Sequence, residues 1–324
     1  MHAVIFASAT VKAKTLLEAE RENLSGRTAP AGATPAAATR KSLGGQKLGV
    51  NAHPLPASVK SDASLDTLLR PPLKWAGGKR WLVPHLAALW LPHSGRRFVE
   101  PFCGGLAVPL GLRPATASLN DINPHLINFY TQLQQGLEIT IAMKNEEQTF
   151  YRHRKRFNKL IDQGDWQSAE AAQLFYYLNR TCFNGLCRFN QSGEFNVPFG
   201  THKSIPYARS FTEYQPLLKN WAFSNRDIES LPVEPEDFIY ADPPYDVEFT
   251  TYSAGGFSWD DQVRTAEWLG AHPGPVVLSN QATTRIVKLY KKLGFQIGYL
   301  EGPRRISCTG DRSAAREVLA TKGL

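Results

Sequence analysis

A carboxylate, two prolines and an aromatic ring follow one another at residues 242–245, where the apolar run FIYA ends. Proline cannot donate a hydrogen bond to a neighbouring strand, so a buried strand is expected to stop here. The Asp242 carboxylate and the Pro243 carbonyl then offer two acceptors, and Tyr245 offers a flat ring. Two acceptors aimed at an exocyclic amine return its lone pair to nitrogen, and the ring can stack on an unstacked base. The segment therefore predicts a pocket that activates the amine of adenine or cytosine. A loop with a helix-capping aspartate is the alternative, but it leaves the prolines and the tyrosine unexplained.

A glycine pair and a downstream acid form a second candidate group. Gly104 and Gly105 follow a predicted strand and open a helix, where glycine lets the backbone approach a ligand closely. The spacing is not G-x-G-x-x-G, which counts against an NAD-dependent oxidoreductase. Asp121 ends the next predicted strand, a position suited to accepting hydrogen bonds from ribose hydroxyls. It is also a candidate helix cap, a role that Asn123 can fill instead.

A third group is LKWAGGKRW, in which Trp75 and Lys79 flank a glycine pair. A cationic side chain beside flexible glycines suits the binding of a carboxylate or phosphate. The spacing does not match a Walker A loop, which requires G-x-x-x-x-G-K-[ST].

Alternating strands and helices must position these groups. Strands are predicted at RRFVEPF, ATASLNDIN, EDFIYAD, PVVLSN and FQIGYL, and helices at residues 124–136, 146–161, 166–180, 260–272 and 283–294. Residues 183–200 predict a hairpin with Ser192-Gly193 near its turn. Such alternation predicts an α/β fold with a mostly parallel sheet and helices on both faces. Ligands of such sheets bind beyond the carboxyl ends of the strands, where the candidate residues gather.

Composition narrows the class of protein. The net charge of +8 makes nucleic acid the leading candidate partner, with an ordinary basic surface as the alternative. The segment YRHRKRFNK at 151–159 is a candidate phosphate-binding patch or simply a solvated helix. No run approaches the roughly 20 apolar residues that span a bilayer. The four cysteines show no metal-site spacing, so we expect reduced thiols and no metal.

From about residue 71 onward the chain resembles the Dam-type (D12 class) DNA adenine-N6 methyltransferases. The matching segments, in the family's order, are LKWAGGK, FVEPFCGG, LNDIN, RTCFNGLCRFNQSGEFNVPFG, ADPPY and LSN. DPPY and FNVPFG are the most specific of these. The resemblance covers nearly all of the globular part and none of residues 1–70, which we expect to be disordered or weakly helical.

The resemblance implies S-adenosyl-L-methionine as methyl donor, double-stranded DNA as substrate and a methyltransferase-type Rossmann fold. Residues 71–131 and 216–324 would form the catalytic domain, and residues 132–215 an inserted target-recognition domain with the DNA-reading hairpin 183–200. By motif, the residues that contact the cofactor would be Trp75, Lys79, Asp121 and Asp242. Those that hold a flipped adenine would be Asp242, Pro243 and Tyr245. Those that contact DNA would be Asn184, Leu186, Arg188 and Pro198.

Two departures from the family pattern bear on these roles. Leu106 stands where the family usually has a further glycine, so the cofactor loop is expected to sit differently or to bind more weakly. Thr201 and His202 replace arginine and tyrosine after the hairpin, which leaves GATC a candidate target rather than an assigned one.

The alternatives are a catalytically weakened DNA-binding protein and an amino-methyltransferase acting on RNA or another amine. We expect a cytoplasmic monomer of bacterial, archaeal or phage origin, with a cognate restriction endonuclease as a candidate partner.

Overall fold

The computed structural model describes residues 69–246, 256–302 and 315–324, which all belong to one compact unit, residues 51–324. The predicted extension, residues 1–70, falls almost wholly outside the described residues, as does Cys308.

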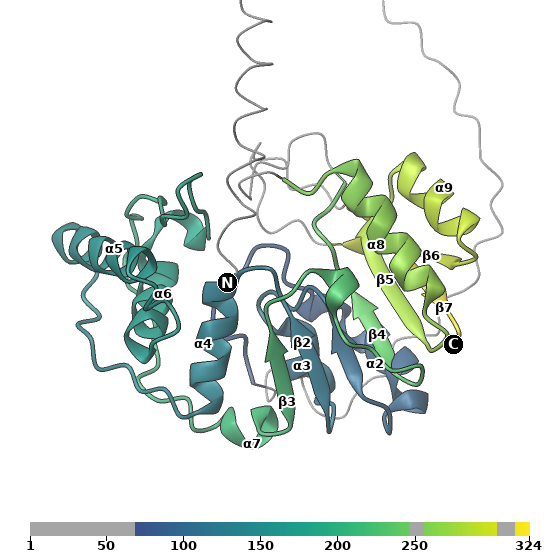
Figure 1. The fold of residues 1–324 in the computed structure, drawn as a ribbon, viewed down its shortest axis with the longest axis horizontal. Coiled ribbons are helices and arrows are strands. Elements are labelled where there is room, and N and C mark those ends of the chain that lie inside the picture. The colour runs from purple at the N-terminus through teal and green to yellow at the C-terminus, as the bar shows by residue number, and fades with distance from the viewer. Residues whose placement is uncertain (1–68, 247–255, 303–314) are drawn as a thin grey trace, which may run out of the picture. The chain divides into compact units, whose positions relative to one another are not determined.

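A seven-stranded sheet forms the centre of this unit (Figure 1). Its strands, in spatial order, are β3 (Trp221–Ser224), β2 (Ala117–Asn120), β1 (Phe98–Glu100), β4 (Phe238–Ala241), β5 (Val276–Gln281), β7 (Ala315–Lys322) and β6 (Gln296–Gly302). The five strands from β3 to β5 are parallel, whereas β7 pairs antiparallel with both β5 and β6. The predicted α/β fold with a mostly parallel sheet is confirmed.

Helices cover both faces of the sheet because side chains alternate along each buried strand. Phe98 and Tyr240 point into a core shared with α2 (Val83–Trp90), α3 (Ala107–Leu112) and α4 (Pro124–Gln134). Their neighbours Val99 and Ile239 point into a second core, which is shared with α8 (Trp259–Ala271) and α9 (Thr284–Lys292). The continuous apolar runs of β1 and β4 are thus explained by burial on both sides.

Residues between α4 and β3 build a helical extension of the sheet domain. Helices α5 (Glu147–Asp162) and α6 (Ala169–Thr181) pack against each other, and α6 packs against α4 (Figure 1). Short elements complete the described structure, namely η1 (Arg80–Leu82), η2 (Leu91–His93), η3 (Phe183–Gly185), α7 (Gln215–Leu218) and η4 (Ile228–Ser230).

The predicted hairpin is present as an irregular antiparallel pair. Phe189 bridges Phe195, and the amide of Asn190 donates to the Glu194 carbonyl across a turn that contains Gly193. At the base, Cys182 bridges Phe199. The hairpin joins α6 directly through η3, so the end of α6 fixes where its first strand begins.

Several elements are absent from the sequence-based prediction. The structure adds strands β3 and β7 and helix α2, whereas α3 is the helix that was predicted to open at the glycine pair. β7 matters most, because its place between β5 and β6 brings Glu317 towards the carboxyl edge of β4 and β5.

Candidate active site

Three carboxylates lie at the carboxyl edge of adjacent strands. Glu100 ends β1, Asp121 follows β2 and Asp242 follows β4. The sheet reverses its direction of winding between β1 and β4, which is where ligands of open α/β sheets bind. We call these three carboxylates, together with Lys79 and Tyr245, the strand-edge site.

Lys79 and Asp242 form a buried ion pair. The Lys79 ammonium lies 2.9 Å from Asp242 Oδ2, and the lysine side chain is only 5% exposed. The same ammonium donates to the Gly77 carbonyl at 2.9 Å, and Ser279 Oγ donates to Asp242 Oδ1 at 2.8 Å. The carboxylate is therefore fixed through both oxygens, while each retains a lone pair for a further donor.

Tyr245 lies beside this pair. The Lys79 ammonium stands 4.6 Å from the centre of the tyrosine ring, a cation–π contact. The phenol donates to Glu317 Oε2 at 2.7 Å. Burial, followed by the charges of Asp242 and Glu317, raises the pKa of Tyr245 well above its usual value. The Tyr245 hydroxyl is therefore a neutral donor, and the side chain is held by Glu317 at the hydroxyl and by Lys79 at one face of the ring.

The two prolines between Asp242 and Tyr245 differ in their surroundings. Pro243 is buried and Pro244 is exposed. Gln262 Nε2 donates to the Pro244 carbonyl at 2.7 Å, whereas no donor from the described part of the chain binds the Pro243 carbonyl. The Pro243 oxygen thus keeps its capacity to accept.

Asp121 ties the glycine turn to the start of α4. Its carboxylate accepts from the Gly104 amide and from the Asn123 amide, both at 3.0 Å. Burial outweighs these two hydrogen bonds and raises the pKa of Asp121 to about 6. The cap of α4 is Asn123, whose side chain accepts from the amides of His125 and Leu126. Asp121 is therefore free of the capping role.

Trp75 packs directly on the glycine turn. A Cβ atom on Gly104 would lie 2.9 Å from Trp75 Nε1, and one on Gly105 would lie 2.8 Å from Trp75 Cβ. Any larger residue at either position would displace the indole. The close approach of Trp75 thus requires glycine at both positions. At position 104 glycine is also favoured by the backbone, whose φ is +44°.

Leu106 adopts the backbone conformation that glycine favours. Its φ of 59° and ψ of 23° are left-handed, and its side chain is fully buried. The leucine therefore preserves the turn expected of a glycine at this position, at a cost of about 1–2 kcal/mol in backbone strain. The loop was expected to sit differently because Leu106 replaces a glycine, but the backbone angles of Leu106 are ones that glycine would also adopt.

Sequence reasoning missed several members of the site. Glu100 is buried, and its Oε2 has no hydrogen-bond partner among the described residues. Burial, then the charges of Asp242 and Asp121, raises the pKa of Glu100 well above its usual value. Ser279, which binds Asp242, and Glu317, which binds Tyr245, were also missed. An acid inside the apolar run FVE was the one available signal for Glu100.

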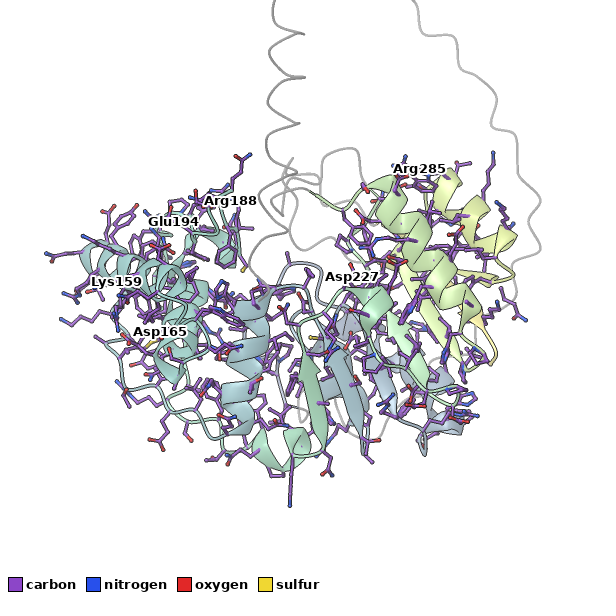
Figure 2. The ribbon with its side chains drawn as sticks, viewed as in Figure 1. Lys159, Asp165, Arg188, Glu194, Asp227 and Arg285 are labelled. Carbon is purple, nitrogen blue, oxygen red and sulfur yellow. The ribbon has the colours of Figure 1, made fainter. Side chains whose placement is uncertain are left out.

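The predicted DNA contacts divide into exposed and packed residues. Asn184, Arg188 and Pro198 are exposed, and Figure 2 shows Arg188 at the outer end of the hairpin. Leu186 is half-buried against the core. Phe183, next to Asn184, is the larger exposed apolar side chain, at 48%.

The basic helix α5 mainly supports the hairpin. Arg154 donates to the Val197 carbonyl at 3.0 Å, and Asn158 exchanges two hydrogen bonds with the backbone of Phe195. Arg156 pairs with Glu170 at 2.6 Å. Lys155 and Lys159 are exposed, and Figure 2 shows Lys159 on the outer side of α5. Only part of the predicted basic patch is thus available to an external anion.

His202, one of the two departures, closes the base of the hairpin. Its Nε2 lies 2.9 Å from the Cys182 carbonyl, and Asn145 Nδ2 donates to the His202 carbonyl at 2.7 Å. Thr201 is exposed beside it. His202 therefore acts within the fold, whereas Thr201 is open to a ligand.

Some features bear on other classes of site. The described residues contain no cluster of histidine, cysteine and acidic side chains that could hold a metal ion. The three cysteines that the structure describes are free thiols. None of the described helices has the length and apolar character needed to cross a membrane.

Comparisons with known proteins agree on one family. The family model of the D12 class N6 adenine-specific DNA methyltransferase matches residues 75–306. The Retron Ec67 DNA adenine methylase of Escherichia coli is 34% identical, over 78% of this chain and 90% of its own. The DNA N-6-adenine-methyltransferase of Escherichia phage P1 is 36% identical, over 76% of this chain and 34% of its own. Type II methyltransferase M.MjaIII of Methanocaldococcus jannaschii is 31% identical, over 75% and 95%.

Proposed function

The chain belongs to the D12 class of N6 adenine-specific DNA methyltransferases, and from that premise we propose a role for each residue of its strand-edge site. The protein is a DNA adenine methyltransferase. We assign S-adenosylmethionine as the donor and a flipped adenine in duplex DNA as the acceptor.

The surroundings of the strand edge fit a donor that carries positive charge. Three carboxylates meet there with one buried ammonium, and one buried oxygen of Glu100 has no partner among the described residues. We propose that Asp121 accepts from the ribose, that Trp75 and the glycine turn form the wall of the pocket, and that Lys79 and Asp242 bound its inner end. The bound donor supplies an electrophilic methyl group on a sulfonium.

The adenine would lie on the outer side of the Asp-Pro-Pro-Tyr segment. Asp242 and the carbonyl of Pro243, which no described donor binds, accept from the two N6–H groups, and Tyr245 stacks on the base. Because Lys79 covers one face of the Tyr245 ring, the base would use the other face.

These contacts make the amine an attacking group. Acceptors on both N–H bonds would localise the nitrogen lone pair, so that N6 could attack the methyl group that a bound sulfonium donor would supply. Asp242 stabilises the positive charge that develops on N6, and the proton leaves after the methyl group has been transferred. Lys79 and Ser279 hold the carboxylate in place throughout, so it need not reorganise during the reaction.

We propose that residues 132–215 recognise the target, with the hairpin 183–200 reading DNA. Asn184, Arg188 and Pro198 are available at its surface, and arginine suits bidentate contact with guanine. Because Leu186 is partly packed, Phe183 joins it as a candidate for insertion between base steps.

Several finer assignments rest on the resemblance alone. GATC is the proposed target, a cognate restriction endonuclease the proposed partner, and a monomer the proposed state. The relatives named above come from a bacterium, a phage and an archaeon, which supports a cytoplasmic location.

The buried Lys79–Asp242 pair beside Tyr245 carries this proposal. The test is incubation with labelled methyl donor and duplex DNA, followed by identification of the modified base. N6-methyladenine is expected from the wild type, and Asp242→Ala should lose at least about a hundredfold in rate. Asp162→Ala, a change at an exposed position on α5, is the matched control. Label on cytosine, on RNA alone or on nothing would refute the proposal.

The weakened-enzyme alternative gains no support from the site. It was motivated by Leu106, whose backbone nonetheless follows the left-handed path open to glycine. Lys79 pairs with Asp242, and Asp121 accepts from the amide of the glycine turn, so neither group of predicted residues is disrupted.

A further inference from the structure

A buried glutamate on β7 reaches into the strand-edge site from a distant part of the chain. Glu317 is 8% exposed and accepts from the Tyr245 hydroxyl at 2.7 Å, although 72 residues separate the two. In the sheet it stands opposite Gln281 of β5 and Leu300 of β6, so its position is fixed by backbone pairing on both sides.

The neighbouring strand leaves room for this carboxylate. Gly302 of β6 is the diagonal neighbour of Glu317, and a Cβ atom on it would lie 2.5 Å from Glu317 Oε1. Any side chain at position 302 would push the carboxylate away. A glycine thus stands where Glu317 needs space, although glycine weakens a strand interior.

A carboxylate at position 317 is energetically unfavourable, because the side chain is buried. Burial raises the pKa of its carboxyl, and Lys79 and the Tyr245 hydrogen bond only partly oppose that effect. The next residues, Val318 and Leu319, are buried apolar side chains typical of a strand. The backbone ladder of β5, β7 and β6 requires no carboxylate, so sheet formation does not explain the glutamate.

The consequence for Tyr245 is a ring fixed at two points. Glu317 holds the hydroxyl end, and the Lys79 ammonium lies over one face at 4.6 Å. A ring that is held before the substrate arrives loses less conformational freedom when a base stacks on it. Without Glu317, the phenol would lose the acceptor that the described residues give it, and the ring would turn to find another.

We propose that Glu317 is a positioning residue that acts through Tyr245 and sets its ring for stacking on the flipped adenine. The inference rests on the proposed function, because it assigns the ring to base stacking.

The test compares Glu317→Ala, Glu317→Gln, Tyr245→Phe and the double variant Glu317→Ala/Tyr245→Phe. Each is assayed for kcat and KM on the duplex that the wild type methylates, and for the fluorescence of 2-aminopurine placed at the target base. Glu317→Ala should lower kcat on the order of tenfold, the effect of one lost hydrogen bond, and should change the fluorescence of the flipped base. Glu317→Gln, whose amide oxygen can accept the same bond, should recover most of both readouts.

Tyr245→Phe removes the hydroxyl without touching Glu317, so it should match Glu317→Ala, and the double variant should add nothing further. Glu301→Ala, an exposed glutamate on β6, is the matched control. Wild-type kcat and fluorescence in Glu317→Ala, or additive effects in the double variant, would overturn the inference. If Glu317→Ala does not fold, the comparison of Tyr245→Phe with Glu317→Gln decides: a normal Tyr245→Phe excludes any role through the hydroxyl. A wild type that labels no adenine refutes the proposed function instead.

Discussion

Asn179 on α6 pairs in both directions with the backbone of Lys74. Its Oδ1 accepts from the Lys74 amide and its Nδ2 donates to the Lys74 carbonyl, each at 2.8 Å. The Lys74 ammonium also donates to the Arg180 carbonyl at 3.2 Å. The segment that carries Trp75 is thus attached to the helix that leads into the hairpin.

Asn179→Ala should weaken donor binding. The change leaves two backbone groups of Lys74 without partners, at a cost of about 1–3 kcal/mol, and frees the segment that carries Trp75. We expect a severalfold rise in the donor dissociation constant by calorimetry. Asn179→Asp keeps the acceptor and loses the donor, so its donor dissociation constant should lie between those of the wild type and Asn179→Ala. A destabilised protein with unchanged donor affinity would show that the pair serves only the fold.

Leu106→Gly should lose stability and keep donor affinity. Removing the buried side chain costs about 2–5 kcal/mol, whereas relief of the left-handed strain returns about 1 kcal/mol. Leu106→Ala keeps the strain and should be the less stable of the two in urea unfolding. A marked gain in donor affinity for Leu106→Gly would indicate instead that the leucine obstructs the loop.

Donor binding should weaken as the pH falls through about 6, the raised pKa of Asp121. Protonation removes the carboxylate acceptor, so affinity should fall by up to about tenfold per pH unit below that value. Asp121→Asn should abolish most of this dependence.

The effect of Asp121 on folding stability has the opposite pH dependence to its effect on donor binding. Its folded pKa lies above that of the unfolded chain, so the native state binds more protons between about pH 4 and 6 and gains stability there. Protonation of Asp121 should therefore weaken donor binding without lowering the free energy of unfolding, whereas acid unfolding would lower both.

His125→Phe should make folding less sensitive to acid. Burial lowers the pKa of His125 to about 4, and the ring stacks on Phe189 of the hairpin with centroids 4.8 Å apart. Below about pH 6.5 His125 is protonated in the unfolded chain but stays neutral in the native state, so the free energy of unfolding falls as the pH drops. At pH 5 this costs about 2 kcal/mol, which the phenylalanine avoids. Urea unfolding of both proteins at pH 7.5 and pH 5 measures the difference, and an equal decline in both would contradict it.

Charge reversal at Lys155 and Lys159 should reduce the salt dependence of DNA binding. Each lost phosphate contact lowers the slope of log K against log salt by about 0.9. The same reversal at the exposed Lys291 and Lys292 of α9 is the matched control. Arg154 is unsuitable for this test, because it holds the hairpin through the Val197 carbonyl. An unchanged slope would restore the interpretation of α5 as a solvated helix.

The sequence placed Asp121 and Asp242 at strand ends correctly, because local signals mark such ends: an apolar run followed by polar or proline residues. The same reasoning identified Asn123 as a helix cap, which depends only on residues close in the chain. Local pattern was sufficient wherever the partners are close in sequence.

Residues whose partners come from remote strands could not be predicted in this way. Glu317 meets Tyr245 only because β7 inserts beside β5, and Ser279 meets Asp242 through pairing of β4 with β5. The basic run of α5 left phosphate contact and a solvated helix as alternatives, and neither included the partners that the fold gives to Arg154 and Arg156. Periodicity cannot indicate which charges a tertiary contact will occupy.

The position of β7 between β5 and β6 also has a consequence during translation. A nascent chain that has been synthesised only through β6 has both of these strands but lacks the one that joins them. Until β7 emerges from the ribosome, β5 presents an unpaired edge, which is a template for association with other chains. Premature termination after β6 and before Glu317 would therefore yield an aggregation-prone product, even though every predicted donor and DNA contact had already been translated.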